Sequence, residues 1–268
     1  MLTARPTRAR VMTGEVHDPT GRFTDRVDDY ARSRPGYPRE VLDAIRADLG
    51  LRPEHAVADV GSGTGLLSRL FVENGNRVYG VEPNAAMAAV AESWLGPTGR
   101  FRTVPGRAEA TGLAPASVDL VTAGQAFHWF SVTESRAEFL RILREPGGIA
   151  LVWNLRRLDS TPFLRDYEAF VRHWSTDYAQ VSERYAEPAS LRAFFGPAPW
   201  REHRFDSRQD FDLHGLRERL LSSSYTPKAG DPRREPMLAA LPELFAAHAR
   251  DGTVAFEYDT RLFTGRLS

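Results

Sequence analysis

The chain has 268 residues and a mass of 30.0 kDa, which is long enough for a large α/β domain to bury its own core. Its 35 Lys and Arg residues balance 35 Asp and Glu residues, so no net charge attracts nucleic acid or anionic lipid. The absence of cysteine excludes disulfides, thiolate metal sites and cysteine nucleophiles, and it favours a cytoplasmic location. No run of apolar residues is long enough to predict a membrane span, and the Arg-rich N-terminus lacks the apolar segment of a secretory signal.

Arginine supplies almost all of the basic residues, because Lys228 is the only lysine. That lysine lies in the turn-like segment TPKAGDP, which suits neither a phosphate-binding loop nor a Schiff base. Kinase, ATPase and pyridoxal phosphate chemistry are therefore disfavoured, and a small molecule is the expected partner.

The N-terminal residues 1–22 are polar and unpatterned, which predicts a flexible tail. Apolar spacing predicts a short helix after Phe23 and a second helix from Glu40 to Leu49. Further along, buried strands separated by helical segments are predicted at 57–60, 77–81, 101–104, 118–123 and 148–153.

Strands that alternate with helices in this way form parallel βαβ units. We therefore expect an α/β fold with a Rossmann-like, doubly wound sheet. Residues 155–250 change to aromatic-rich helices and Pro-rich loops, which we interpret as a helical substrate cap. The alternating segment 253–267 is expected to add an antiparallel strand at the sheet edge. The prediction is one domain over 23–268, with 23–154 as its cofactor-binding core.

A glycine-rich turn, GSGTG, follows the strand that ends in Asp59 and Val60, and Glu82 closes the next strand. This arrangement predicts a cofactor that contains adenosine, whose ribose hydroxyls would bind to Glu82. A dinucleotide-binding loop needs a small residue where this chain has Leu66. Asp59 would also repel a pyrophosphate. S-adenosylmethionine carries positive charge and no phosphate, so the charge pattern favours it.

At these residues the chain resembles the class I S-adenosylmethionine-dependent methyltransferases, and within them the small-molecule group similar to trans-aconitate methyltransferases. The resemblance covers roughly residues 23–156, and more weakly the segment LLSSSYTP and the C-terminal strand. It implies a seven-stranded sheet whose last strand is antiparallel, S-adenosylmethionine as cofactor with S-adenosylhomocysteine as product, and no metal.

The resemblance also implies a set of cofactor contacts. Glu82 would hold the ribose, Asp59 would lie near the methionine amino group, and Arg34 would pair with the cofactor carboxylate. The full set is Tyr30, Arg34, Asp59, Gly61, Gly63, Glu82, Pro83, Asn84, Ala108, Glu109 and Gln125. For Glu109 a role in capping the following turn remains an alternative.

The segment QAFHWF directly follows the fourth strand, at the edge where open α/β sheets bind ligands. His128 is the candidate catalytic base, although a substrate contact or a packing role remains open. The expected substrate contacts are Phe127, His128, Trp129, Trp153 and Tyr225. Arg156 and Arg157 either bind an acceptor carboxylate or form a solvated pair.

Together these features predict methyl transfer from S-adenosylmethionine to a small organic acceptor in the cytoplasm (EC 2.1.1.-), as part of biosynthesis in specialised metabolism. Transfer to O or N is favoured over transfer to C. Two alternatives stay open: a nicotinamide-dependent oxidoreductase, and a module that binds S-adenosylmethionine without catalysis. Neither nucleic acid nor a membrane is an expected partner, and the oligomeric state is not predicted.

Overall fold

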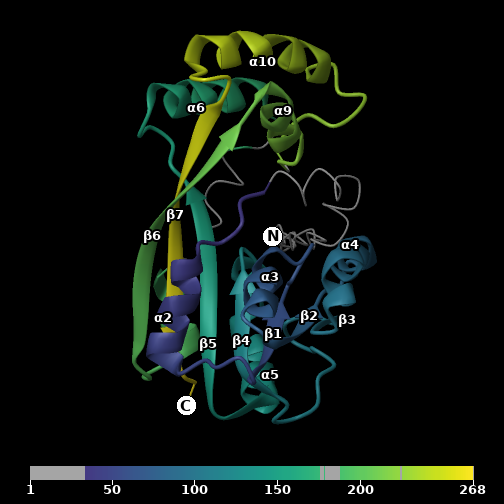
Figure 1. Ribbon diagram of the computed structural model, residues 1–268, viewed down its shortest axis with the longest axis vertical. Helices are drawn as coiled ribbons and strands as arrows, with labels where there is room; N and C mark the ends of the chain where they lie inside the picture. Colours follow the sequence, from purple (N-terminus) through teal and green to yellow (C-terminus); the bar gives the residue numbers. More distant parts are fainter. Residues whose placement is uncertain (1–33, 176–177, 179–187, 224, 268) are drawn as a thin grey trace, which may run out of the picture.

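A computed structural model describes residues 34–175, 178, 188–223 and 225–267. A seven-stranded sheet forms the lower part of the molecule, and a layer of helices lies above it (Figure 1). The tail predicted for 1–22 and the helix predicted after Phe23 fall outside the described residues.

The sheet has the strand order β3-β2-β1-β4-β5-β7-β6. The first five strands run parallel to their neighbours, and β7 runs antiparallel to both β5 and β6. This confirms the predicted Rossmann-like sheet with an antiparallel last strand. The strands are β1 (Ala56–Val60), β2 (Arg77–Val81), β3 (Phe101–Val104), β4 (Val118–Gly124), β5 (Leu143–Arg156), β6 (Trp200–Phe211) and β7 (Val254–Gly265).

Helices cover both faces of the sheet. On one face pack α2 (Arg39–Leu49), α3 (Leu66–Glu73) and α4 (Ala85–Leu95), whose apolar residues share a buried cluster with the strands. On the other face, α5 (Val132–Ile142) and α8 (Pro188–Phe195) contribute Phe139 and Phe194 to a second cluster. Short 3₁₀ turns lie at Gly96–Thr98 (η2) and Phe127–Trp129 (η3).

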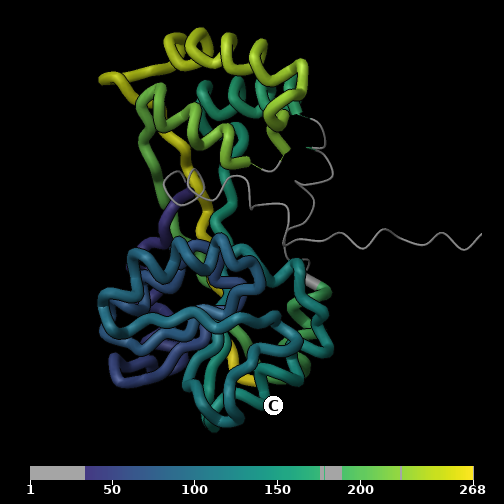
Figure 2. The backbone as a smooth tube through the Cα atoms, turned by 90° about the vertical axis from the view of Figure 1, so that its right-hand side faces the viewer, coloured from purple at the N-terminus to yellow at the C-terminus, as the bar shows by residue number. Residues whose placement is uncertain are grey.

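Above the carboxyl ends of the parallel strands lies a helical layer, which we call the cap. It consists of α6 (Pro162–Trp174), α9 (Leu213–Leu221) and α10 (Arg234–His248) (Figures 1 and 2). Its apolar core includes Val254, Phe256 and Tyr258 from the first half of β7. The cap is therefore built on the same strand that completes the sheet below it. Among the described residues, no helix is both apolar and long enough to cross a membrane.

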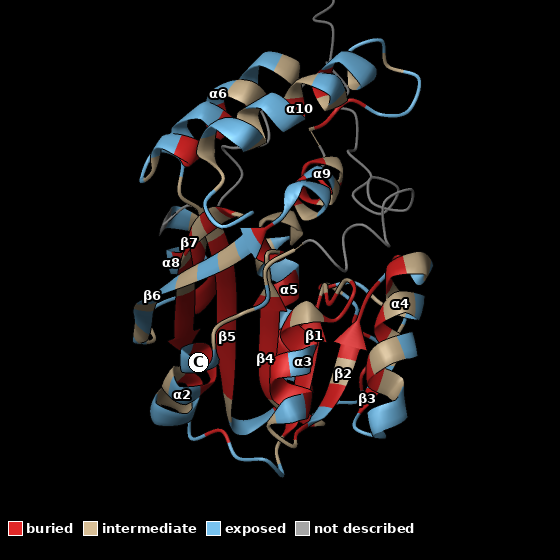
Figure 3. Cartoon of the chain, turned by 45° about the horizontal axis from the view of Figure 1, so that its top comes forward, coloured by how far each residue is buried: buried red, intermediate tan, exposed pale blue. Residues whose placement is uncertain are grey.

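Two expectations about the last strands are wrong. The segment 200–211, expected within the cap, is the sheet strand β6, and β6 rather than β7 forms the edge. The sequence of β6 gives no alternating apolar pattern, because an edge strand exposes many of its side chains to solvent (Figure 3). β7 lies between β5 and β6 instead, and its regularly spaced buried residues reflect that inner position.

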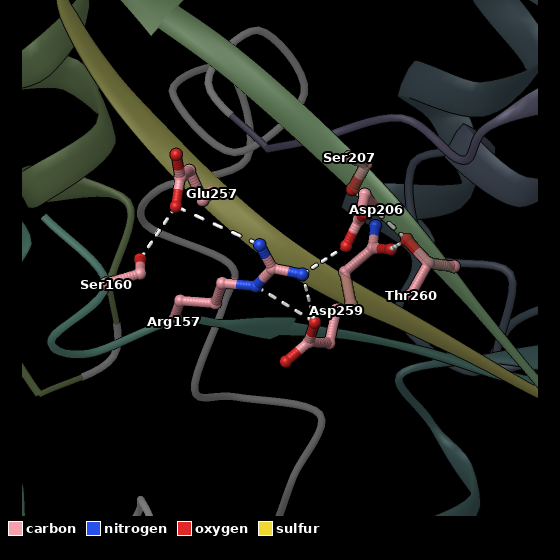
Figure 4. Close-up of polar contacts among 8 residues, drawn as sticks. Arg157, Ser160, Asp206, Ser207, Glu257, Asp259 and Thr260 are labelled. Atoms are coloured by element: carbon pink, nitrogen blue, oxygen red, sulfur yellow. Dashed lines mark hydrogen bonds and ion pairs between the residues drawn. The ribbon is translucent and has the colours of Figure 1, made fainter.

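Arg157 lies where the β6–β7 ribbon leaves the sheet. The pairing of β5 with β7 ends at Arg156 opposite Tyr258, whereas the β6–β7 ladder continues up to the cap. Asp206 and Asp259 face each other across that ladder, and the Arg157 guanidinium binds both carboxylates (Figure 4). The arginine thereby neutralises two like charges at the base of the cap.

Candidate functional site

The glycine loop between β1 and α3 has the conformation that its sequence predicts. Gly61, Gly63 and Gly65 all have positive φ angles, of 69°, 55° and 86°. A Cβ atom on Gly61 would lie 2.6 Å from the Cβ of Ala126, which comes from the segment after β4. Glycine at this position therefore allows both the turn and a close approach of two loops.

Asp59 is completely buried at the end of β1, and its Oδ2 accepts a hydrogen bond of 2.6 Å from the Ser68 hydroxyl. Burial raises the pKa of Asp59 to about 7, and the nearby charge of Glu82 acts in the same direction. Three buried atoms of this region have no hydrogen-bond partner in the described structure: Oδ1 of Asp59, Oγ of Ser62 and Oγ1 of Thr64. The loop thus holds an unusual group of unsatisfied polar atoms.

Glu82 is tied to the same loop. Its Oε2 accepts a 2.9 Å hydrogen bond from the Gly63 backbone N–H, and its Oε1 accepts one of 2.9 Å from the N–H of Asn84. Burial raises the pKa of Glu82, while these two bonds lower it. Asn84 in turn caps α4 through its Oδ1, and Pro83 is exposed beside it.

Gln125 follows β4 with a φ of 56°, which is unusual for a residue other than glycine. Its side-chain amide donates a 2.7 Å hydrogen bond to the Asn154 backbone carbonyl. Asn154 also donates to the Gly36 carbonyl at 3.1 Å and accepts from the Thr260 hydroxyl at 2.6 Å. This buried asparagine joins four segments at the site, and sequence analysis missed it because one Asn after an apolar strand carries no specific signal.

Ala108 and Glu109 lie in the turn after β3. Ala108 is buried. The Glu109 carboxylate accepts a 2.8 Å hydrogen bond from the N–H of Ser131 at the start of α5. This bond connects Glu109 to the start of α5 and not to the turn that directly follows it, so both roles considered for Glu109 stay predictions.

The segment QAFHWF forms η3 and divides into two environments. His128 and Trp129 are half-buried, with ring centroids 4.8 Å apart. Phe127 and Trp153, both 2% exposed, pack in the core with Phe194 instead. Their role as substrate contacts stays a prediction.

Residues of the N-terminal segment and the cap meet above the sheet. Arg34 donates a 3.1 Å hydrogen bond to the carbonyl of Ser222, at the end of α9. The rings of Tyr225 and Tyr178 lie edge-to-face, with centroids 4.8 Å apart. Tyr30 falls outside the described residues.

Arg156 and Arg157 do not form a solvated pair. Arg156 is buried against Glu168, and Arg157 binds the strand carboxylates described above. Within the described part of the chain, no group of three or more His, Asp or Glu side chains has a metal-binding arrangement.

The chain is similar in sequence to methyltransferases. A family described as a methyltransferase domain matches residues 58–152. An uncharacterized methyltransferase of Mycobacterium tuberculosis is 29% identical over 257 residues, covering 93% of this chain and 97% of the relative. An uncharacterized methyltransferase of Schizosaccharomyces pombe is 26% identical over 226 residues, covering 83% of this chain and 86% of the relative.

Solved structures share the fold. A putative type II methyltransferase from Anaeromyxobacter dehalogenans has a TM-score of 0.63 and 25% identity, over 87% of this chain and 97% of its own. A putative methyltransferase from an antibiotic biosynthesis pathway in Anabaena variabilis has a TM-score of 0.61 and 24% identity, over 89% of this chain and all of its own. In sequence and in fold, the chain is therefore similar to methyltransferases.

Proposed function

We propose that the protein transfers a methyl group from S-adenosylmethionine to a small organic acceptor in the cytoplasm, at O or N. The observation that carries this proposal is the group of unsatisfied polar atoms at the glycine loop, on Asp59, Ser62 and Thr64. Buried polar atoms normally have partners. Their position around the loop fits a polar ligand that contacts the backbone closely.

The residues present fit this cofactor. When bound, S-adenosylmethionine supplies a methyl group on a cationic sulfonium, which is electrophilic without a metal. The Asp59 carboxylate would face the methionine amino group, and Gln125 would offer its carbonyl oxygen to the same group. Each Glu82 oxygen accepts one backbone N–H and has a further lone pair for a ribose hydroxyl. Pro83, Asn84, Ala108 and Glu109 would surround the adenine, with Arg34 near the carboxylate.

The acceptor would lie between η3 and the cap. Trp129 offers an apolar surface, and His128 offers a ring nitrogen to orient the acceptor or remove its proton. Holding both reactants in attack geometry supplies most of the available acceleration, up to about 7–11 kcal/mol. A cap of helices over the sheet favours a small acceptor over a macromolecule, and we place the reaction in the biosynthesis of specialised metabolites.

Calorimetric titration of the purified protein with S-adenosylmethionine, S-adenosylhomocysteine and NADH tests the cofactor. We expect binding of the first two and none of NADH. Incubation with methyl-labelled S-adenosylmethionine and a panel of phenols, amines and carboxylic acids then tests the reaction. Tight binding without labelled product across the panel would favour a non-catalytic module, and binding of NADH alone would contradict the proposal.

A further inference from the structure

Two arginines are buried at the base of the cap. Arg156 is the last residue of β5, with 8% of its side chain exposed. Arg219 lies in the last turn of α9 and is 5% exposed. Burying a guanidinium costs several kcal/mol, in order of magnitude, unless an anion pairs with it.

Arg156 has one carboxylate partner. Its Nη2 donates to Glu168 at 2.5 Å and to the Tyr178 hydroxyl at 3.1 Å. Its guanidinium lies 5.2 Å from the Tyr167 ring centroid. Its Nη1 is buried and has no hydrogen-bond partner among the described residues.

Arg219 has no carboxylate partner in the described part of the chain. Its Nη1 donates to the Ser223 hydroxyl at 2.9 Å, and its guanidinium lies 5.7 Å from the Phe256 ring centroid. Its Nε is buried and finds no acceptor there. The carbonyl end of α9 favours a cation, but this effect is too weak to replace a carboxylate partner.

Among the described residues, positive charge therefore exceeds negative charge around these two arginines. Glu168 is the carboxylate that faces Arg156, and it is shared with the half-exposed Arg172 at 2.8 Å. The same charges affect Tyr225. Burial raises the pKa of its phenol, but the charges of Arg219, Arg156 and Arg34 and a hydrogen bond with Ser223 lower it below the usual value. The two guanidiniums lie against neighbouring rings, because the Tyr167 ring beside Arg156 and the Phe256 ring beside Arg219 have centroids 4.8 Å apart. The two arginines therefore lie around a common point.

We propose that Arg156 and Arg219 bind an anionic group of the acceptor, a carboxylate or a phosphate, and that this group anchors the acceptor without being methylated. This inference rests on the proposed function and names the substrate class of that site. The open N–H groups of the two guanidiniums would donate to the anion. Lone pairs held by two cations are poor nucleophiles, so the methyl group goes to another atom of the acceptor.

The same geometry explains selectivity. A neutral acceptor of the same shape would leave Arg219 without a carboxylate partner among the described residues, and Arg156 with only the carboxylate that Arg172 shares. A site built for a charged group rejects an analogue that lacks it far more strongly than one that differs by a methylene. Acceptors with an anionic group remote from their nucleophilic atom should therefore be preferred.

The first test uses the wild-type full chain and needs no variant. Thermal unfolding is followed at constant ionic strength with acetate, benzoate, inorganic phosphate or phenyl phosphate, and with acetamide and benzamide as neutral controls. We expect at least one anion to raise the melting temperature and the amides to leave it unchanged. Comparing the carboxylates with the phosphates identifies the preferred group. Equal effects of benzoate and benzamide, or no effect of any anion, would overturn the proposal.

The second test compares Arg219→Met with Arg217→Gln, an exposed arginine on the same helix. Arg219→Met should weaken the stabilising anion by about tenfold or more, the loss expected for a hydrogen bond to a charged group. Arg217→Gln should bind it normally. If Arg219 had only a structural role, the Arg219→Met protein would be less stable but would bind the anion with unchanged affinity. If Arg219→Met does not fold, the comparison of anions with neutral amides on the wild-type protein still tests the proposal.

Cofactor binding separates this inference from the proposed function. Arg219→Met should bind S-adenosylmethionine as the wild type does, because the glycine loop is untouched. A wild-type protein that selects anions but binds no S-adenosylmethionine would overturn the proposed function alone. Two other results would overturn the proposed anion site and leave the proposed function intact. One is labelled product from neutral acceptors only, and the other is a methyl ester formed on the anchoring carboxylate.

Discussion

Ser68 donates a hydrogen bond of 2.6 Å to Oδ2 of Asp59 inside the protein, while Oδ1 of the same carboxylate has no partner among the described residues. Burial raises the pKa of Asp59 from 3.8 to about 7. Between these values the folded protein binds more protons than the unfolded chain, so stability falls as the pH rises. We expect the unfolding free energy to decrease by a few kcal/mol, in order of magnitude, from pH 4 to pH 7.

Urea unfolding across this pH range measures the effect, and Asp59→Asn is the matched variant. It keeps the shape of the side chain and removes its titration, so its stability should depend less on pH. Glu82, whose pKa is also raised, leaves a residual slope of the same sign. An identical pH dependence in Asp59→Asn and the wild type would refute the assignment.

Glu82→Gln should weaken binding of S-adenosylmethionine. The variant loses the negative charge that accepts from the loop N–H groups and, under the proposed function, from the ribose. Loss of charged hydrogen bonds predicts a cost of about 1.5–3 kcal/mol, or tenfold to a hundredfold in Kd. Calorimetry measures this, with Glu73→Gln on the exposed end of α3 as a control. Unchanged affinity in Glu82→Gln would exclude the ribose role.

Gly61→Ala should impair cofactor binding more than its backbone strain alone explains. Gly61 and Gly252 have similar positive φ angles, of 69° and 77°, but a Cβ on Gly61 meets Ala126 whereas one on Gly252 meets nothing within 4 Å. Gly252→Ala therefore controls for the strain, roughly 1–2 kcal/mol. We expect Gly61→Ala to lose measurable affinity for S-adenosylmethionine and Gly252→Ala to keep it. Equal affinities would show that the contact with Ala126 is unimportant.

The sequence was sufficient to predict the cofactor-binding half of the fold, because there each signal is local. Buried parallel strands appear as apolar runs, and the turn after Val60 needs glycines at fixed spacing. The edge strand β6 was not predictable in this way. Its residues alternate little in polarity, since its position is set by pairing with β7, a strand more than forty residues away.

In the site, too, local sequence patterns predict some contacts and not others. The contact between Glu82 and the glycine loop was predictable, because the carboxyl ends of the neighbouring parallel strands β1 and β2 lie at the same edge of the sheet. The hydrogen bonds of Asn154 join residues 36, 125 and 260, and no short stretch of sequence contains that information. Phe127 and Trp129 are close in sequence, yet one enters the core and the other stays half-buried, because η3 turns their side chains in different directions.

Arg157→Met should destabilise the β6–β7 ribbon. Without the guanidinium, Asp206 and Asp259 face each other as unneutralised like charges. The side chains are partly exposed, so we expect a loss of only about 1 kcal/mol. The double variant Arg157→Met with Asp206→Asn should recover part of it in urea unfolding, because one of the two charges is gone. No recovery would mean that Arg157 acts through packing.

His128 lies half-buried beside Trp129 at the carboxyl end of the sheet, where a base would have to stand. If it removes a proton from the acceptor, His128→Ala should lower kcat by about a hundredfold or more and remove the acidic limb of the pH–rate profile. His128→Asn keeps a hydrogen-bonding side chain but no base, so it should restore KM without restoring kcat. Recovery of kcat in the asparagine variant would instead make His128 a residue that orients the acceptor. Affinity for S-adenosylmethionine should stay constant in both variants, which confines the effect to the acceptor side of the site.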